Sequence, residues 1–203
     1  MNSFTEQVHL RAATSDDIPA IQAVDMAAGK LFDATGLIDE GPDGQQPVPT
    51  DVLEAGVESG FLWVAVYEPD HIVGFVLYRK QSPDLYLEQI SVDPAVGRRG
   101  LGARLTQKAI DMADDLRLRG VILSTFRDVR WNGPFYARQG FEEIPRDQMR
   151  KWMFDLEDAQ SLSMDVKLRC FMRRPGRFAK NWIRLPSGEK NSSNKPVAAG
   201  QKT

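Results

Sequence analysis

The sequence predicts a mixed α/β fold, in which a mostly antiparallel central sheet of six or seven strands is flanked by about four helices. Three segments rich in β-branched and aromatic residues follow one another at 61–67, 72–80 and 85–92, with short turns between them. Consecutive strands joined by short turns pair antiparallel. A helix-like segment at 100–119 and an apolar segment at 121–126 then complete a strand–helix–strand unit, whose strands should be parallel.

The region before these strands predicts one strand, at 7–13, and two helices. Ser15, Asp16 and Asp17 offer N-caps and first-turn acids to a helix whose apolar residues recur at helical spacing, namely Ile18, Ile21, Val24, Ala28 and Leu31. Residues 32–50 are rich in glycine and proline, which predicts a loop. The second helix is predicted at 51–59.

The region from residue 100 onward predicts three helices and the remaining strands. The helix at 100–119 should bury one face, formed by Leu101, Leu105, Ala109, Met112 and Leu116. A short helix is expected at 134–139, ending at Gly140, and a strand should begin at Phe141. A helix at 152–160 and a last strand at 166–172 complete the expected elements.

Length and charge divide the chain into one domain and a tail. With 203 residues and 42% hydrophobic content, the chain can bury a full core, and we expect a single domain at 1–174. Residues 173–203 hold eight Lys and Arg residues and one acid, Glu189. We therefore expect a basic, disordered tail at 175–203.

Several classes of protein are disfavoured by composition. The N-terminus lacks a basic stretch before an apolar run, and no apolar run approaches the roughly 20 residues that span a bilayer, so a cytoplasmic protein without a membrane partner is expected. Cys170, His9 and His71 are too few and too scattered for a zinc site, and no metal is expected. The tail could contact nucleic acid, but no motif supports a nucleic-acid partner. A homodimer remains open.

A glycine-rich turn lies between the strand at 85–92 and the following helix. Gly97, Gly100 and Gly102 stand at the helix entrance, where the absence of side chains lets a ligand oxygen approach the amides of Arg99 to Gly102. Arg98, Arg99 and Arg104 add positive charge around this turn. Tight packing of helix on strand also selects glycine, so the turn alone is equally compatible with both explanations.

Two motifs together carry a resemblance to a known family. The run VDPAVGRRGLGARL, at 92–105, resembles the acyl-CoA pyrophosphate loop of the GNAT (GCN5-related) N-acetyltransferase superfamily. About 30 residues downstream, WNGPFYARQGF, at 131–141, is similar to its second signature, Asn-x-x-x-Tyr followed by Gly-Phe. The chain departs from the first motif at Gly97, where the family usually has Arg or Gln, and Arg98 stands where glycine is common.

The resemblance implies how the chain would hold acetyl-CoA as co-substrate. The strand around Gln89 would hydrogen-bond the pantetheine arm and the acyl carbonyl through its backbone, and Asn132, beside Phe135, would contact the CoA arm. The cofactor-binding residues expected on this basis are Ile90, Ser91, Val92, Gly97, Arg98, Arg99, Gly100, Leu101, Gly102, Ala103, Asn132 and Phe135.

Two residues are candidates for proton transfer. Tyr136 matches the family tyrosine that protonates the departing CoA thiolate, and a tyrosine with a pKa near 10 is protonated at neutral pH. Glu88 could accept a proton from the incoming amine, and strand alternation would place it on the face of Ile90 and Val92 or just outside the core. It could equally be an exposed carboxylate or be paired with an arginine, and water could replace it as base.

The acceptor side carries weaker signals. Arg127 and Asp128 follow the strand at 121–126, where they could contact a polar acceptor or could form an ion pair that fixes the loop. The acidic loop residues Asp33, Asp39, Glu40 and Asp43 would favour a cationic amine, or could simply form a hydrated loop.

The sequence thus predicts an acetyl-CoA-dependent N-acyltransferase that moves an acetyl group to a primary amine. No cysteine stands near the motifs, which favours direct transfer in a ternary complex over an acyl-enzyme. The alternative is a non-catalytic acyl-CoA-binding or regulatory module on the same fold. The acceptor stays open among small amines, amino acids, aminoglycoside-like antibiotics and protein amines.

Overall fold

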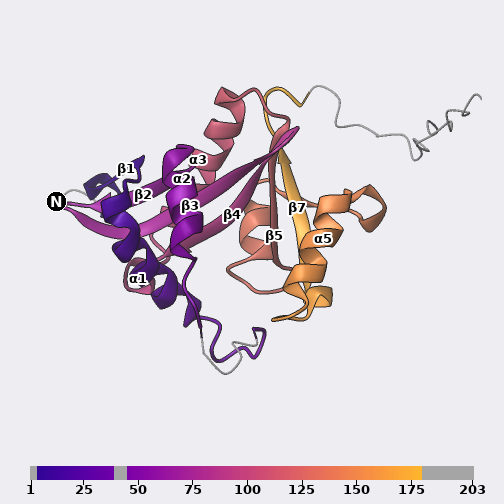
Figure 1. Ribbon diagram of the computed structural model, residues 1–203, viewed down its shortest axis with the longest axis horizontal. Helices are drawn as coiled ribbons and strands as arrows, with labels where there is room; N and C mark the ends of the chain where they lie inside the picture. Colours follow the sequence, from indigo (N-terminus) through magenta and orange to yellow (C-terminus); the bar gives the residue numbers. More distant parts are fainter. Residues whose placement is uncertain (1–3, 39–44, 180–203) are drawn as a thin grey trace, which may run out of the picture.

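The computed structural model describes residues 4–38 and 45–179 (Figure 1). The strands are β1 (Val8–Ala12), β2 (Leu62–Tyr67), β3 (His71–Gln81), β4 (Asp84–Val92), β5 (Gly120–Phe126), β6 (Glu142–Glu143) and β7 (Arg169–Pro175). The α-helices are α1 (Ile18–Gly29), α2 (Thr50–Glu58), α3 (Leu101–Asp115), α4 (Gly133–Arg138) and α5 (Lys151–Gln160). Short 3₁₀ helices include η2 (Ser15–Asp17), η3 (Pro94–Val96) and η5 (Val166–Leu168).

The strands form a seven-stranded sheet in the order β1-β2-β3-β4-β5-β7-β6. All neighbouring pairs are antiparallel except β4 and β5, which are parallel. The predicted fold class is therefore confirmed, including the parallel pair on either side of α3. The last strand, β7, lies between β5 and β6, so the sheet order departs from the chain order at this edge.

The parallel pair opens before its strands end. Pairing of β4 with β5 covers only residues Leu85–Leu87 against Val121–Leu123, although β4 continues to Val92 and β5 to Phe126. Figure 1 shows the two strands close together at one end and diverging toward the other. The sheet thus splits into two halves, with an opening between the C-terminal ends of β4 and β5.

A β-bulge lies where the strands begin to separate. Leu77 of β3 pairs with Gln89, and the next residue, Tyr78, pairs with Leu87, so Glu88 of β4 has no partner in the register. A bulge bends its strand and reverses the alternation of side chains beyond it. The bulge at Glu88 therefore coincides with the point at which β4 leaves β5.

Helices cover both faces of the sheet. On one face, the core cluster contains buried side chains of α3 and α4, such as Leu105 and Tyr136. On the other face, α1 and α2 pack on β2 and β3 around Ile21 and Leu53. On that same face, α5 packs on the second half of the sheet, where Met153 meets Tyr86 and neighbouring side chains. Each half of the split sheet therefore has its own packed layer on the face that carries α1, α2 and α5.

Two helices are shorter in the structure than the sequence predicts. Leu31 lies beyond the end of α1 and is 46% exposed, and Leu116 caps α3 and is 38% exposed. The helix α3 ends in a Schellman motif, because Arg117 adopts φ +55° and the amide of Leu118 donates to the carbonyl of Ala113 at 2.8 Å. The reversal buries Leu118 in place of Leu116.

The last strand differs from its predicted bounds of 166–172. Residues 166–168 form η5, and β7 runs from Arg169 to Pro175, paired over its whole length with β5. Beyond it, Gly176 donates its amide to the carbonyl of Arg119 at 2.8 Å, and Arg177 forms an ion pair with Asp114 at 3.3 Å. Most of the predicted tail, residues 180–203, lies outside the described residues.

Candidate active site

The turn between β4 and α3 forms a nest of backbone amides. After η3, Arg98 and Gly100 both adopt left-handed conformations, with φ of +60° and +81°. None of the backbone hydrogen bonds in the described residues is donated by the amides of 98–103, because the first turn of α3 has no preceding carbonyls to bond. Free amides at a helix N-terminus bind phosphate, so these residues fit the pyrophosphate of a CoA donor.

The glycines of this turn act for different reasons. A Cβ at Gly100 would meet nothing within 4 Å, so its positive φ is what requires glycine there. A Cβ at Gly102 would lie 3.5 Å from the ring of Phe135, which places the entrance of α3 against α4. Close packing therefore does not by itself require glycine at either position, and ligand approach to the amides stays a prediction.

The three predicted arginines of the nest have distinct surroundings. Arg104 donates to the carbonyl of Val8 at 2.8 Å and so ties α3 to β1. The guanidinium of Arg99 lies over the ring of Phe4, 4.7 Å from its centroid. Arg98, like Arg99, is exposed, and neither forms an ion pair within the described part of the chain.

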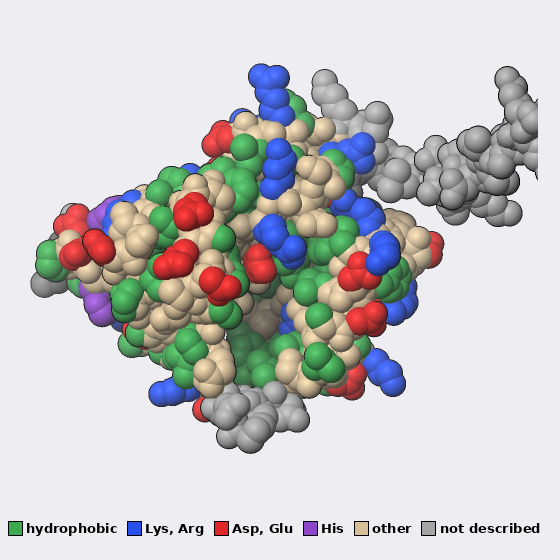
Figure 2. Space-filling view, viewed as in Figure 1, with side chains coloured by type: hydrophobic (Ala, Val, Ile, Leu, Met, Phe, Trp, Pro, Cys, Tyr) green, Lys and Arg blue, Asp and Glu red, His purple; other side chains and the backbone are tan. Residues whose placement is uncertain are grey.

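The edge of β4 next to this nest is open toward β5. Beyond Leu87 its backbone pairs only with β3. Ile90 and Val92 pack toward α3, whereas Gln89 and Ser91 face α1. The predicted pantetheine-binding strand thus offers an unpaired backbone edge at the split in the sheet. Figure 2 shows the molecule hollowed in this region, with hydrophobic side chains around the lower part of the hollow.

Asp25 organises the α1 side of the opening and was missed in the sequence. Its carboxylate accepts hydrogen bonds from Gln89 Nε2 at 2.8 Å, Ser91 Oγ at 2.8 Å and the Val48 amide at 3.0 Å. The residue is only 6% exposed. A lone acid among the apolar residues of α1 is the signal that could have identified it.

Tyr136 lies on α4, which packs closely against the end of β5. A Cβ at Gly133 would lie 2.2 Å from the carbonyl oxygen of Arg127, so only glycine permits this approach. The ring of Tyr136 packs edge-on against Phe135 and Phe141, and Asn132 provides the carbonyl at the start of the helix. The second predicted motif therefore forms one compact unit beside the split strands.

The hydroxyl of Tyr136 suits a proton donor. The residue is 7% exposed, and its hydroxyl forms no hydrogen bond with the described residues. The hydroxyl oxygen is nevertheless not completely buried. The tip of the side chain therefore keeps access to solvent. Burial raises the pKa of Tyr136 above the ordinary value of 10.0, although the charge of Arg169 acts in the opposite direction. The hydroxyl is accordingly protonated at neutral pH.

Glu88 lies on the face opposite to Ile90 and Val92. Its Oε2 is 3.4 Å from Nε of Arg79, and Arg79 pairs across the strands with Tyr86. The bulge explains this orientation, because the extra residue interrupts the alternation on which the sequence expectation relied. Glu88 is exposed just outside the core and paired with an arginine, two of the alternatives that the sequence left open.

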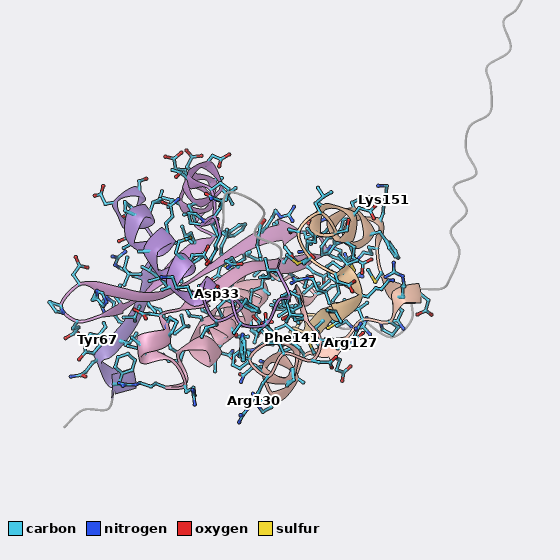
Figure 3. The ribbon with its side chains drawn as sticks, turned by 90° about the horizontal axis from the view of Figure 1, so that it is seen from below. Asp33, Tyr67, Arg127, Arg130, Phe141 and Lys151 are labelled. Carbon is cyan, nitrogen blue, oxygen red and sulfur yellow. The ribbon has the colours of Figure 1, made fainter. Side chains whose placement is uncertain are left out.

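In the loop after β5, Arg127 forms an ion pair with Glu143 and not with its sequence neighbour Asp128. Arg127 forms an ion pair with Glu143 at 3.0 Å and donates to the carbonyl of Lys167 at 2.9 Å, so it fixes the loop to β6 and to η5. Figure 3 shows Arg127 and Arg130 in the half of the molecule that carries β7 and α5. Asp128 is exposed. Of the acidic loop residues, Asp33 is exposed, and Asp39, Glu40 and Asp43 lie outside the described residues.

Aromatic and basic side chains line the β5–β7 side of the opening. Phe126 packs against Phe32, with ring centroids 5.6 Å apart, and Phe32 also meets Trp131 at 5.9 Å. The guanidinium of Arg169 lies 4.8 Å from the centroid of Phe126. Sequence reasoning missed Arg169, because its place beside Phe126 depends on the register of β7.

A cavity of about 320 Å³ lies elsewhere, beside the start of α1 and the β2–β3 turn. Its lining includes Asp17, Asp70 and His71. It holds none of the predicted site residues, which lie on β4, in the turn before α3 and on α4. Within the described ranges, no three His, Cys, Asp or Glu side chains gather as metal ligands, and no helix is long and apolar enough to cross a membrane.

Comparison with known proteins agrees with this geometry. Residues 31–141 match the model of the acetyltransferase (GNAT) family. The chain is 31% identical over 151 residues to an amino-acid acetyltransferase of Mycobacterium tuberculosis, covering 72% of this chain and 75% of that protein.

Solved structures share the fold. One is N-acetylglutamate synthase from Neisseria gonorrhoeae complexed with coenzyme A and N-acetyl-glutamate (TM-score 0.61, 18% identity), where the match covers 83% of this chain and 35% of that one. The chain thus spans about a third of that enzyme. Another is the ribosomal-protein-S18-alanine N-acetyltransferase from Escherichia coli (TM-score 0.61, 15% identity), where the match covers 88% of this chain and 99% of that one. With the amide nest and the split sheet, the family match shows that this chain belongs to the GNAT acetyltransferase family.

Proposed function

We propose that the protein transfers the acetyl group of acetyl-CoA directly to the amino group of an amino acid, within a ternary complex. The observation that carries the proposal is the split between β4 and β5, which leaves one edge of β4 unpaired next to the amide nest. It is supported by Tyr136, which belongs to the core cluster against which Ile90 and Val92 of β4 pack. The name of the Mycobacterium tuberculosis relative, an amino-acid acetyltransferase, supports an amino acid as acceptor.

The residues of the chain divide the work between binding and proton transfer. The amides of 98–103 hold the pyrophosphate, with Arg98 beside them, and the free edge of β4 from Gln89 to Val92 holds the pantetheine arm and the thioester carbonyl. Asn132 and Phe135 border the arm from α4. Acetyl-CoA supplies an acetyl group activated as a thioester.

Tyr136 and Glu88 are the proposed proton donor and acceptor. As the C–N bond to the acceptor forms and the C–S bond breaks, Tyr136 donates its proton to the departing sulfur. Glu88, on the face of the sheet that also carries α1 and α5, accepts the proton that the amine loses, directly or through water. Tyr136 belongs to the core on the α3 face of the sheet, whereas Glu88 and Arg79 lie on the face that carries α1 and α5.

Replacement of Tyr136 by phenylalanine tests the proposal. Because only the hydroxyl is lost, we expect kcat to fall by about 10²-fold or more while the dissociation constant of acetyl-CoA stays within about twofold. Thiol release over a panel of amines measures turnover, and calorimetry measures acetyl-CoA binding. If the wild-type protein binds acetyl-CoA but releases no thiol with any acceptor, the chain is a binding module and the proposal fails.

A further inference from the structure

Arg169 is a partly buried cation without a carboxylate partner in the described part of the chain. Two other partly buried arginines each have one, since Arg11 pairs with Asp17 at 2.6 Å and Arg150 pairs with Asp84. A buried charge is costly unless it is paired. The surroundings of Arg169 therefore lack the anion that such a site normally includes.

The guanidinium is nevertheless held in a fixed place. Its Nε and Nη2 donate to Ser124 Oγ at 3.3 and 3.1 Å, and Nη2 also donates to the Ser124 carbonyl at 3.1 Å. The ring of Phe126 lies beneath it at 4.8 Å. Nη1 has no partner among the described residues, so part of the planar donor fork remains available to a ligand.

The guanidinium of Arg169 lies near the proposed site of acetyl transfer. Arg169 begins β7 opposite Phe126, at the end of β5 that has separated from β4. Its guanidinium packs on the ring of Phe126, the last residue of β5. The next residue of β7, Cys170, belongs to the core cluster that contains Tyr136. The guanidinium therefore lies at the end of β5 that borders the split.

We propose that Arg169 binds the α-carboxylate of the amino-acid acceptor, an inference that rests on the proposed acetyltransferase function. In every α-amino acid the carboxylate and the α-amino group are attached to the same carbon. One arginine beside the reaction centre can therefore hold the carboxylate and direct the amine toward the thioester. Arginine matches a carboxylate through parallel N–H donors, and the ligand supplies the missing counter-charge. The neighbouring rings of Phe126, Phe32 and Trp131 offer an apolar wall to the rest of the acceptor.

Substrate analogues test this without altering the protein. Amino acids, their α-carboxamides and the corresponding decarboxylated amines keep the same side chain and a primary amine while the carboxylate is neutralised or removed. We expect kcat/KM for thiol release to be at least about tenfold higher for the acids. Equal use of acids and carboxamides overturns the role of Arg169 but leaves the proposed function standing, whereas no release with any compound overturns the proposed function.

Variants identify the residue that recognises the carboxylate. Arg169→Gln should raise KM for the amino acid at least about tenfold, with a smaller effect on KM for acetyl-CoA, and Arg169→Lys should fall between it and wild type. Arg174→Gln, the same change at the other end of β7, is the control and should leave both constants unchanged.

A binding measurement gives a readout that is independent of turnover. Calorimetry with an N-acetylated amino acid in the presence of CoA should show weaker binding to Arg169→Gln than to Arg174→Gln. The amide analogue of that ligand should bind all three proteins, wild type included, equally weakly. Unchanged affinity of the acid in a folded Arg169→Gln protein contradicts the proposal.

Discussion

At the scale of single residues, Asp25 connects helix α1 with strand β4 and with the segment before α2. A buried carboxylate is tolerated only when it is hydrogen-bonded, and Asp25 accepts from three donors that belong to β4 and to the segment before α2. The same bonds fix the side chains of Gln89 and Ser91 on the strand that is proposed to hold the thioester. One carboxylate thus sets the position of two elements that are distant in sequence.

Removal of this carboxylate should destabilise the protein. Asp25→Ala leaves the donors of Gln89, Ser91 and Val48 without their acceptor, and we expect a loss of about 1–3 kcal/mol in the free energy of unfolding. Thermal denaturation should then show a melting temperature lower by several degrees. Asp33→Ala, which removes an exposed aspartate that follows the same helix, is the matched control. Equal melting of the two variants would show that the Asp25 network is dispensable.

Because Glu88 is paired with Arg79, two variants can show whether Glu88 acts as a base or only as a partner in the ion pair. If Glu88 accepts the proton of the amine, Glu88→Gln should lower kcat by about 10²-fold. Arg79→Gln also breaks the 3.4 Å pair but keeps the carboxylate, so it should lower kcat only a few fold. Steady-state assays measure kcat of both variants. An equal fall in kcat would show that the ion pair is structural. An unchanged kcat in Glu88→Gln would show that water accepts the proton.

At the scale of elements, the start of α1 depends on a cluster built around Asp17. Its carboxylate accepts from both terminal nitrogens of Arg11, at 2.6 and 2.8 Å, and from the amide of Thr14 at 2.7 Å. These bonds connect β1 to the turn that precedes the helix. The guanidinium of Arg11 is the main reason that the pKa of Asp17 lies below its ordinary value of 3.8.

This lowered pKa predicts the pH dependence of a variant. A carboxyl group whose pKa is lower in the folded state contributes stability above its unfolded pKa, and the contribution is lost as the pH falls through the folded pKa. We expect Asp17→Asn to be less stable than wild type by about 1–3 kcal/mol at pH 7. In urea denaturation across pH, the difference should shrink once the pH falls below about 4. A difference that is constant down to pH 2 would contradict this origin.

The elements also show what the sequence could and could not predict. Helices and strands with regular apolar periodicity were predicted closely, and so was the amide nest, because its glycines and the helix that follows are local in sequence. The orientation of Glu88 and the place of Arg169 were not predictable in this way. The orientation of Glu88 depends on a bulge within the β3–β4 hairpin, which apolar alternation does not reveal. The place of Arg169 depends on the register of β7 against β5, a strand distant in sequence, and β7 begins three residues beyond its expected start.

At the scale of the whole molecule, the proposed site combines residues from both halves of the split sheet. The half with α1, α2 and α3 provides the amide nest, the open edge of β4 and Asp25, and the half with β5, β7 and α5 provides Arg169. Tyr136 connects the two halves. Its helix, α4, packs on the end of β5, and the ring of Tyr136 belongs to the core around α3. A ligand that bridges the halves should therefore stabilise the whole fold, by an amount that rises with the logarithm of its concentration relative to its dissociation constant.

The boundary of the domain can be placed by two truncations. Removal of residues 180–203 keeps Pro175 in β7, the amide of Gly176 on Arg119 and the ion pair of Arg177 with Asp114. We therefore expect a chain ending at Ala179 to melt within about 2 °C of the full chain, and to bind acetyl-CoA with a dissociation constant within about twofold of that of the full chain.

A chain ending at Arg174 loses these contacts at the end of the strand that begins with Arg169, and its melting temperature should fall by several degrees. Scanning calorimetry and titration with acetyl-CoA measure both effects. If removal of 180–203 alone weakened acetyl-CoA binding, the basic segment would belong to the donor site and the domain would extend beyond Ala179.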